Sequence, residues 1–448
     1  MHMSQLLIGN GRLVTRDPAQ SYFENGCVAV EADRILEVGK TDELRAKYPE
    51  AEWIDAGGGV IMPGMICTHN HIYSAFARGL SIKGYSPQNL MDILKGMWWT
   101  IDVHLDREET KWSAYAVYLE CIKNGTTSVF DHHASFGEID GTLFQIADVA
   151  KELGVRSCLC FEVTDRNGEE AMHRAVKENE EFILAAQKDD TGMLAGMMGM
   201  HAPFTLSDAS IEYCKEHTPE GAGYHIHVAE GIEDVQDSLK KYGKRTVERL
   251  YDLGILGPLT IAGHCVYVSK HEIGILKDTN TMVVHNPESN MGNAVGCGPV
   301  LQMEQAGVLM GLGTDGYTND MFESYKVANI LHKHNLADPG AAWAEIPHML
   351  FFGNAEIAGR YFKKAPIGVL KTGAAADIIV TDYIPDTPMS SDNVNSHILF
   401  GMNGRSTTTT IVNGKVLMKD RKIIVADEDE ILARCRESAA KLWADVNK

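Results

Sequence analysis

Histidine and acidic residues stand at several points of the chain in a pattern suited to metal chemistry. Thr68-His69-Asn70-His71 carries two imidazoles two residues apart, and on a strand such side chains project from the same face. Far downstream, His227 and Asp315 each close an apolar run. Three imidazoles and one carboxylate would form a site suited to Zn²⁺, with Fe²⁺ as the alternative. Taken alone, His69 and His71 are also compatible with two satisfied core histidines.

A metal site of this kind would supply a nucleophile, because it lowers the pKa of a bound water from 15.7 toward about 7. Release of an amine also requires a proton donor beside the metal. Glu230, three residues after His227, is the candidate, and the alternative is a solvated glutamate at a helix start. His264 could polarise the carbon under attack or hold the oxyanion, unless it is a core histidine, and Asp315 could accept the proton of the water. We therefore expect Glu230, His264 and Asp315 to be catalytic.

Further polar residues follow other apolar runs, where they could contact a substrate. Glu162 and Arg166 are candidates of this kind, and Arg166 could pair with a substrate carboxylate or carbonyl, but a structural salt bridge fits equally well. His132 and His133 follow the run Thr126 to Phe130 and could instead be a surface pair. Residues 91–99, which end in Met-Trp-Trp, are expected to cover the mouth of the site.

Two distant parts of the chain share a β-like texture. Residues 5–8, 27–30 and 34–38 are short runs broken by Gly and Asn, and residues 376–382 and 408–416 repeat the pattern, with Asn413-Gly414 as a hairpin signal. This predicts a small composite β-sandwich domain built from residues 1–62 and 369–424. The alternative is two unrelated hairpins.

Between these ends, residues 63–368 alternate strand-sized apolar runs with amphipathic stretches. The strand candidates are 126–131, 155–163, 194–201, 224–228, 260–264, 281–285 and 308–314, and helix candidates include 111–123, 141–153 and 169–187. Repeated strand-helix units over this length predict an α/β fold of the (β/α)8 TIM-barrel type. The metal-type residues fall at the ends of the runs, where a barrel has its catalytic rim. Residues 425–448 are expected to form a C-terminal helix on the outside.

Composition excludes several classes of partner. The 448 residues include 41 basic and 61 acidic side chains, a formal charge of −20, which disfavours nucleic acid and anionic lipid. Nine scattered cysteines without a Cys-x-x-Cys pair favour a reducing, cytoplasmic location. The first ten residues lack a basic leader, and no apolar stretch reaches about 18 residues, so we expect neither export nor a membrane span.

The ordered motifs resemble those of the amidohydrolase superfamily, in its branch of guanine, S-adenosylhomocysteine and triazine deaminases and chlorohydrolases. Within that branch the chain most resembles the aminohydrolases grouped as SsnA, for which the likeness gives no substrate. The motifs are Pro63-Gly64 through His71, His227-Val-Ala-Glu230, Gly263-His264-Cys265, His285-Asn286-Pro287, Gly313-Thr314-Asp315-Gly316 and the closing segment 411–416.

The resemblance implies roles for several residues. His69, His71, His227 and Asp315 would hold one divalent metal, Glu230 would shuttle the proton, and His264, with His285 from the next motif, would contact the substrate. The spacing of the family motif selects His227 over His225. No lysine stands out at a strand end as a bridge to a second metal, which favours a single metal. After Asn286-Pro287 the chain departs from the family by carrying Glu288 and lacking a lysine, which leaves the substrate open.

The sequence thus predicts a metal-dependent hydrolase that uses metal-bound hydroxide to replace an amino group on a small N-heterocyclic substrate, with release of ammonia. Ring opening of a cyclic amide or amidine, as in an imidazolone, uses the same groups and stays an alternative. A catalytically silent scaffold is the third reading. A homodimer or larger homo-oligomer is expected from the resemblance.

Overall fold

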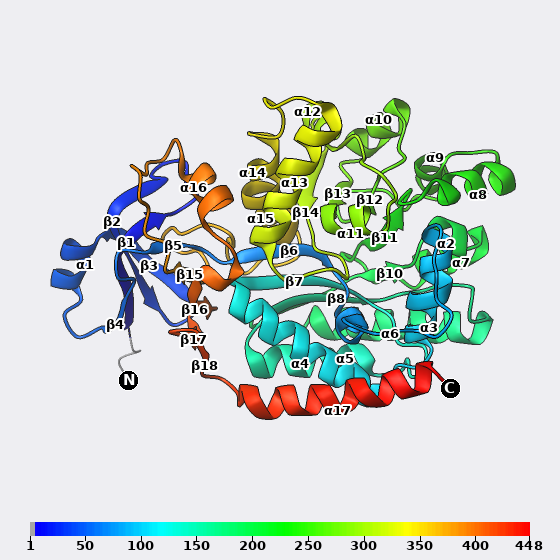
Figure 1. Cartoon of the computed structure of the whole chain (residues 1–448), viewed down its shortest axis with the longest axis horizontal. Helices are drawn as coiled ribbons and strands as arrows, with labels where there is room; N and C mark the ends of the chain where they lie inside the picture. Colours follow the sequence, from blue (N-terminus) through cyan, green and yellow to red (C-terminus); the bar gives the residue numbers. More distant parts are fainter. Residues whose placement is uncertain (1–4) are drawn as a thin grey trace.

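The computed structural model describes residues 5–448 and divides into a β domain and a larger barrel (Figure 1). The β domain holds both ends of the described chain apart from the last helix. Its strands are β1 Gln5–Val14, β2 Tyr22–Glu31, β3 Arg34–Lys40, β4 Glu52–Asp55, β5 Val60–Pro63, β15 Ile378–Thr381, β16 Thr407–Val412, β17 Lys415–Lys419 and β18 Lys422–Ile423.

These strands form one sheet in the order β18-β17-β16-β15-β5-β1-β2-β3, with β4 beside β1. The two chain ends meet where β15 pairs with β5 in antiparallel register, Ile378 opposite Pro63. The hairpin between β16 and β17 turns through Asn413 and Gly414, whose φ values of 50° and 78° suit the predicted two-residue turn. The two β segments are therefore one sheet, and the reading as unrelated hairpins is wrong.

The barrel strands are all parallel and lie close to their predicted positions. They are β6 Met65–Asn70, β7 Thr126–His133, β8 Arg156–Phe161, β9 Leu194–Gly196, β10 Met198–Met200, β11 Tyr224–Val228, β12 Ile261–His264, β13 Met282–His285 and β14 Leu309–Leu312. They pair as two sheets, β6-β7-β8-β9 and β10-β11-β12-β13-β14. Met197 alone separates β9 from β10, so the two count as one barrel strand and the barrel has eight strands.

Single bridges connect the two sheets on both sides. Val163 beyond β8 pairs with Met200 in β10, and Asn70 at the end of β6 pairs with Asp315 just beyond β14. The inside of the barrel is filled by alternate strand residues such as Ile66, Phe130 and Val284, which share one buried cluster. The predicted (β/α)8 class is confirmed.

Helices lie between the barrel strands in the sequence and surround the barrel in space (Figure 1). They are α4 Arg107–Asn124, α5 Thr142–Leu153, α6 Glu169–Ala186, α7 Asp208–Glu216, α8 Ile232–Tyr242, α9 Thr246–Asp252, α10 Lys270–Asp278, α11 Pro287–Gly292, α12 Val300–Ala306, α13 Met321–Leu336, α14 Glu345–His348 and α15 Asn354–Gly359. The β domain adds α1 Thr41–Lys47 and α16 Val394–Gly401.

A short helical segment lies over the barrel mouth, where residues 91–99 were expected. It consists of α2 Leu90–Ile93, a π-helical turn Leu94–Trp98 and α3 Trp99–Asp102. The last helix, α17 Glu428–Val446, runs along α4 (Figure 1). Its Trp443 indole donates to the Phe76 carbonyl, in the segment after β6, at 2.6 Å. In residues 5–448, no helix combines the length and apolarity that crossing a bilayer requires.

A buried ion pair joins the barrel to the β domain. The Arg156 guanidinium, at the start of β8, contacts both carboxylate oxygens of Asp377 at 2.9 and 3.0 Å, and each side chain is 3% exposed. Asp377 also accepts from the Asn413 amide at 2.7 Å, next to the hairpin turn.

Replacing Asp377 by Ala should destabilise the protein strongly, because it leaves the Arg156 charge buried without a partner. A loss of roughly 3–5 kcal/mol is expected for such a change. Denaturant unfolding would measure it as a lower midpoint. Asp140→Ala removes the exposed pair with Arg174 and is the control, with an expected loss of about 1 kcal/mol or less. Equal midpoints for the two variants would contradict the importance of the buried pair.

Candidate metal centre and active site

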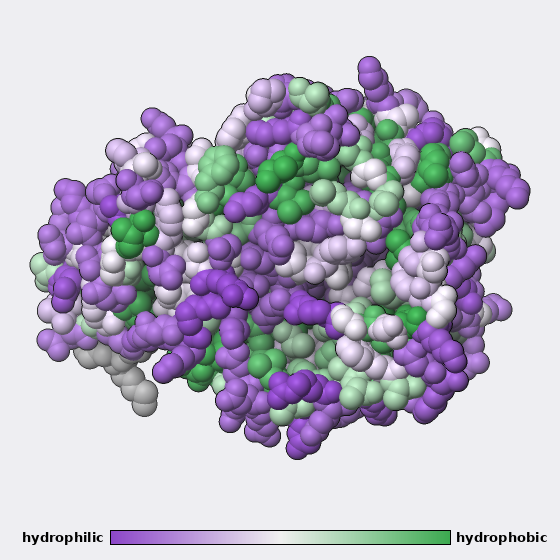
Figure 2. Space-filling model, in the orientation of Figure 1, coloured by the Kyte–Doolittle hydropathy of each residue, from purple (hydrophilic) through white to green (hydrophobic). Residues whose placement is uncertain are grey.

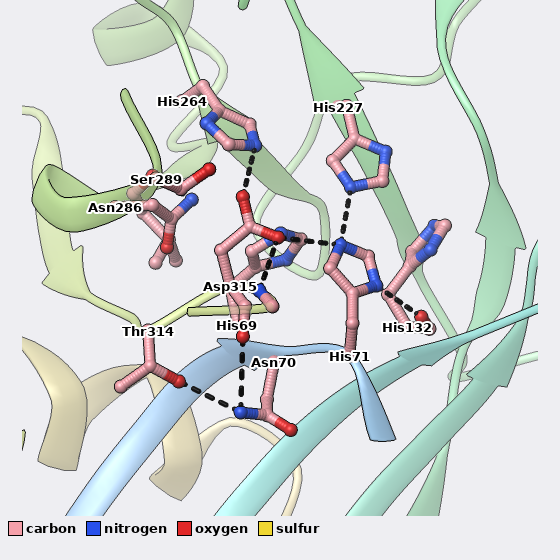
Figure 3. A network of polar contacts seen from close by, with 12 residues as sticks. His69, Asn70, His71, His132, His227, His264, Asn286, Ser289, Thr314 and Asp315 are labelled. Atoms are coloured by element: carbon pink, nitrogen blue, oxygen red, sulfur yellow. Dashed lines mark hydrogen bonds and ion pairs between the residues drawn. The ribbon is translucent and has the colours of Figure 1, made fainter. Parts of the chain in front are cut away.

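The predicted metal-type side chains converge at the carboxyl ends of the barrel strands (Figure 3). His69 and His71 come from the end of β6, His227 from β11, His264 from the end of β12 and Asp315 from the turn after β14. Ligand atoms of His69, His71 and His227 lie within 4.8 Å of one another, and so do those of His69, His264 and Asp315. The structure therefore brings together residues that are up to 246 positions apart in sequence.

Hydrogen bonds fix which nitrogen each imidazole presents to the centre. The Nδ1–H of His71 donates to the His132 carbonyl at 2.6 Å, and that of His227 donates to the His201 carbonyl at 2.7 Å. Both Nε2 atoms therefore face inward, 3.1 Å apart, where each would offer a lone pair to a bound cation once its ring is neutral. This arrangement of outer hydrogen bonds is typical of metal-ligating histidines.

His69 presents its Nε2 in the same way. Its Nδ1 lies 2.8 Å from Nε2 of His225, one layer deeper in the barrel, and its own Nε2 is buried without a hydrogen-bond partner. Burial lowers the pKa of His69 well below its ordinary value, so the ring is neutral. A buried, neutral nitrogen without a donor is suited to bind a cation.

Asp315 supplies the negative charge of the centre. One carboxylate oxygen lies 3.0 Å from His71 Nε2 and 3.9 Å from His69 Nε2. Although burial opposes its charge, the neighbouring His71 keeps the pKa of Asp315 well below its usual range. The carboxylate in turn raises the pKa of His71 to about 9, against the effect of burial. The pair thus favours positive charge beside the carboxylate, and the donor set fits a divalent metal held by His69, His71, His227 and Asp315.

The turn that carries Asp315 is fastened to β6. The amides of Thr314 and Asp315 both donate to the His69 carbonyl at 3.0 Å. The side-chain amide of Asn70 donates to the Thr314 hydroxyl at 2.8 Å and to the Asp315 carbonyl at 3.3 Å (Figure 3). The carboxylate and the two histidines of β6 therefore keep a fixed spacing.

Glu230 and His264 lie beside this centre. His264 Nε2 is 3.8 Å from one Glu230 oxygen and 3.5 Å from one Asp315 oxygen. The other Glu230 oxygen accepts from the Asn293 amide at 3.3 Å. Burial is the largest effect on Glu230 and raises its pKa, so this carboxyl group holds a proton more readily than an exposed glutamate does. A buried carboxyl group and an imidazole thus face the same small space as the predicted metal ligands.

Asn290, in α11, orients His264. Its side-chain oxygen lies 2.8 Å from His264 Nδ1, and both side chains are fully buried. Asn290→Ala should lower kcat by roughly 10- to 100-fold, as expected for loss of an orienting partner, with the metal content unchanged. Asn290→Asp keeps an acceptor and should restore most of the activity. Steady-state kinetics with metal analysis tests this, and unchanged kcat in Asn290→Ala would remove Asn290 as a positioning residue.

The backbone is left-handed at several of these strand ends. The φ values are 48° for Ala229, 70° for His264, 51° for Cys265 and 54° for Asp315. Residues other than glycine rarely adopt this conformation, which costs about 1–3 kcal/mol each and is concentrated at functional sites. The strain aims His264 and Asp315 into the barrel mouth.

The space between these side chains is a small cavity of about 40 Å³. Its wall includes Tyr73, Leu94, Trp98, Glu162, His201 and Tyr317 in addition to ligand residues. A groove of about 720 Å³ adjoins it and shares Ser74, Trp98, Asp315, Gly316 and Tyr317 with its wall. Figure 2 shows a hollow on this face, with hydrophilic residues at its rim. The metal cavity therefore opens toward a larger binding space.

Other predicted contacts lie farther from the cavity. Arg166 does not line it but donates to Glu162 at 3.1 Å and to Asp102, so its guanidinium is already paired. His285 is buried on the helix side of β13, where its Nε2 lies 3.2 Å from Nε2 of His332. Neither residue touches the cavity in this conformation, and their substrate roles stay predictions.

The sequence also left the roles of His132, His133 and Glu288 undecided. His132 forms part of the centre's surroundings, with its ring centroid 4.6 Å from that of His227. His133 contacts the Ser135 hydroxyl at 3.0 Å. Glu288 does not line the cavity, and burial raises its pKa to about 8.

Sequence reasoning missed His201, Tyr73 and Asn290. His201 lines the cavity directly after β10, and its position at the end of the run 194–201 was the available signal. Tyr73 follows the His69–His71 strand and lines the same cavity. Asn290 lies in a helix whose contact with His264 no local pattern predicts.

Comparison with known proteins bears on the family of the chain. The Amidohydrolase family model matches residues 60–417, and a model of the imidazolonepropionase-like composite domain of bacteria matches residues 26–51. A 5′-deoxyadenosine deaminase of Methanosarcina mazei is 33% identical over 99% of this chain and 100% of its own length. A 5-methylthioadenosine/S-adenosylhomocysteine deaminase of Pelotomaculum thermopropionicum is 30% identical over 98% of this chain and 99% of its own.

A crystal structure of an adenosine deaminase from Xanthomonas campestris with bound zinc superimposes with a TM-score of 0.87. It is 25% identical and covers 98% of this chain and 99% of its own. The match of the family model spans the whole barrel, the predicted metal ligands and most of the later β strands. The chain therefore belongs to the amidohydrolase family.

Proposed function

We propose that the protein is a metal-dependent aminohydrolase that removes the amino group from the base of an adenosine-type nucleoside and releases ammonia. The observation that carries the proposal is the meeting of three inward-facing imidazole nitrogens, one carboxylate and a second carboxylate with a raised pKa in one cavity. The two deaminases similar over the full chain support the choice of substrate class.

A divalent metal would be held by His69, His71, His227 and Asp315, and it would lower the pKa of a coordinated water toward about 7. Zinc is the preferred ion because three imidazoles and one carboxylate suit its coordination, and iron is the alternative. No lysine lines the cavity in the described chain, which supports a single metal.

Glu230 would carry the proton in the reaction. Its carboxylate would take one proton from the attacking water and deliver it to the ring nitrogen, and it would then pass the second proton, from the hydroxyl group added to the carbon, to the departing amine. Its raised pKa makes Glu230 a better proton acceptor than an exposed glutamate, which suits a group that accepts and then donates a proton. His264, 3.8 Å from Glu230, would hold the oxygen that develops negative charge at the attacked carbon.

The cavity dimensions indicate how a nucleoside would bind. The metal cavity, at about 40 Å³, is far smaller than the ~300 Å³ of an ordinary ligand site, whereas the adjoining groove, at about 720 Å³, is in that range. The base would enter the cavity as the segment carrying Leu94 and Trp98 moves outward, and the sugar would lie toward the groove.

The test is a substrate screen with zinc-loaded protein. Adenosine, 5′-deoxyadenosine, 5′-methylthioadenosine and S-adenosylhomocysteine are compared with pterins, pyrimidines and triazines for ammonia release. Absorbance of the intact ring separates deamination from ring opening, because only ring opening destroys the chromophore. Deamination of at least one adenine nucleoside is expected. Activity confined to another ring class, or loss of the ring, would overturn the proposal.

A further inference from the structure

We propose that Glu162 and His132 form a subsite that recognises a hydrogen-bond donor of the substrate, either an N–H or an O–H. The inference rests on the proposed function and concerns the same cavity. It adds a specificity element made of two acceptor atoms that face each other.

Glu162 presents one free carboxylate oxygen. The residue follows β8, is 2% exposed and lines the metal cavity. One of its oxygens accepts from the Arg166 guanidinium at 3.1 Å. The other lies 3.9 Å from His132 Nδ1, beyond hydrogen-bond range.

His132 presents an acceptor toward that oxygen. Its Nε2 lies 3.0 Å from the Met200 carbonyl, which can only accept, so Nε2 carries the proton. In the neutral ring Nδ1 then holds a lone pair. This nitrogen is buried and has no hydrogen-bond partner in the described chain.

His132 Nδ1 is a buried acceptor without a partner, and the acceptor oxygen nearest to it belongs to Glu162, which lines the cavity and cannot donate to it as a carboxylate. An unmet buried polar atom costs about 1–3 kcal/mol. Tyr73 lines the same cavity, yet His132 Nδ1 has no hydrogen-bond partner within residues 5–448. A substrate amino group, which has two N–H bonds, would satisfy both acceptors, whereas a ring N–H or a sugar hydroxyl would satisfy one of them. A substrate without a donor would leave both unmet.

The carboxylate is held firmly enough to discriminate. Arg166 donates to Asp102 at 3.3 Å as well as to Glu162, and its guanidinium lies 5.0 Å from the Trp99 ring and 4.9 Å from the Phe136 ring. Asp102 belongs to α3, the end of the segment over the barrel mouth. The acceptor is therefore preorganised, and its position is linked to that segment.

The test compares wild type with Glu162→Gln on three nucleosides. Adenosine and 2′,3′-dideoxyadenosine differ in sugar hydroxyls, and 2,6-diaminopurine riboside adds an amino donor to the ring. In wild type we expect at least one pair to differ more than about tenfold in kcat/KM, because sites built for a donor reject analogues that lack it. In Glu162→Gln the new amide can donate to His132, so that difference should shrink to about threefold or less.

Two further variants keep the result decisive. His132→Phe retains the carbonyl that accepts from His71 but lacks Nδ1, and it should lose the same discrimination if Glu162→Gln does not fold. Glu178→Gln alters a buried carboxylate on α6, which binds the Gly141 and Leu143 amides, and should leave the substrate ratios unchanged. Equal loss for all three nucleosides, or unchanged ratios, would overturn the subsite.

Calorimetric binding of the same nucleosides separates this inference from the proposed function. Binding with the expected preference but without ammonia release would refute only deamination. Turnover with no preference would refute only the subsite. Absence of both binding and turnover would refute both.

Discussion

Glu230→Gln should retain the metal and lose most of the turnover. The amide keeps the size of the side chain and can still contact Asn293, which now lies 3.3 Å from a carboxylate oxygen. It cannot exchange protons with water or with a leaving amine. Loss of a general acid-base group costs roughly a hundredfold to ten-thousandfold in kcat. Ammonia release under saturating substrate, with elemental analysis of the same sample, measures both effects.

Glu233→Gln is the matched control for that variant. Glu233 lies three residues farther along the chain and does not line the metal cavity. Its variant should keep wild-type kcat within about twofold, as surface changes away from a site usually do. Full activity in Glu230→Gln would remove Glu230 from the proton transfer, and loss of metal in that variant would assign it to coordination instead.

Asp315→Ala should bind the divalent metal far more weakly and be inactive as purified. The carboxylate is the one anionic member of the proposed ligand set, His69, His71, His227 and Asp315, and its oxygen lies 3.0 Å from His71 Nε2. Removing this carboxylate should lower the metal affinity by more than the 10- to 100-fold that results when a hydrogen-bond partner of a ligand is removed. Stripping wild type with a chelator should likewise abolish activity, and added zinc should restore it in wild type but not in Asp315→Ala.

Asp131→Asn provides the comparison for that variant. Asp131 is a fully buried carboxylate on the adjacent strand β7, and it accepts from the Ile72 amide at 2.6 Å without belonging to the ligand cluster. It should retain metal under the same dialysis. An unchanged metal content in Asp315→Ala would refute the fourth ligand, whichever activity it shows.

The regular elements of the barrel were predictable because each depends on local pattern. The strand 224–228 has its predicted limits, and the helix expected over 141–153 forms at 142–153. Local pattern could not decide whether His225 or His227 faces the metal centre. Two residues apart on one strand, both face the barrel interior, and only depth separates the nitrogen that points to the metal centre from the one that contacts His69.

The predicted contacts of His285 and Arg166 show what position at a strand end leaves undecided. Strand residues alternate between the two faces, and Val284 points into the barrel, so His285 points out toward His332. Arg166 meets Asp102, 64 positions away, which no local pattern could reveal. Orientation within a strand was available from the alternation, whereas partners from remote loops required the structure.

The pairing of β5 with β15 has a consequence for biosynthesis. Because Pro63 lies opposite Ile378, the sheet that begins near the amino terminus cannot be completed until the entire barrel has left the ribosome. Unpaired strand edges invite association with other chains while they wait. We expect nascent or truncated forms that end before residue 378 to depend on chaperones, and separately expressed barrels to aggregate.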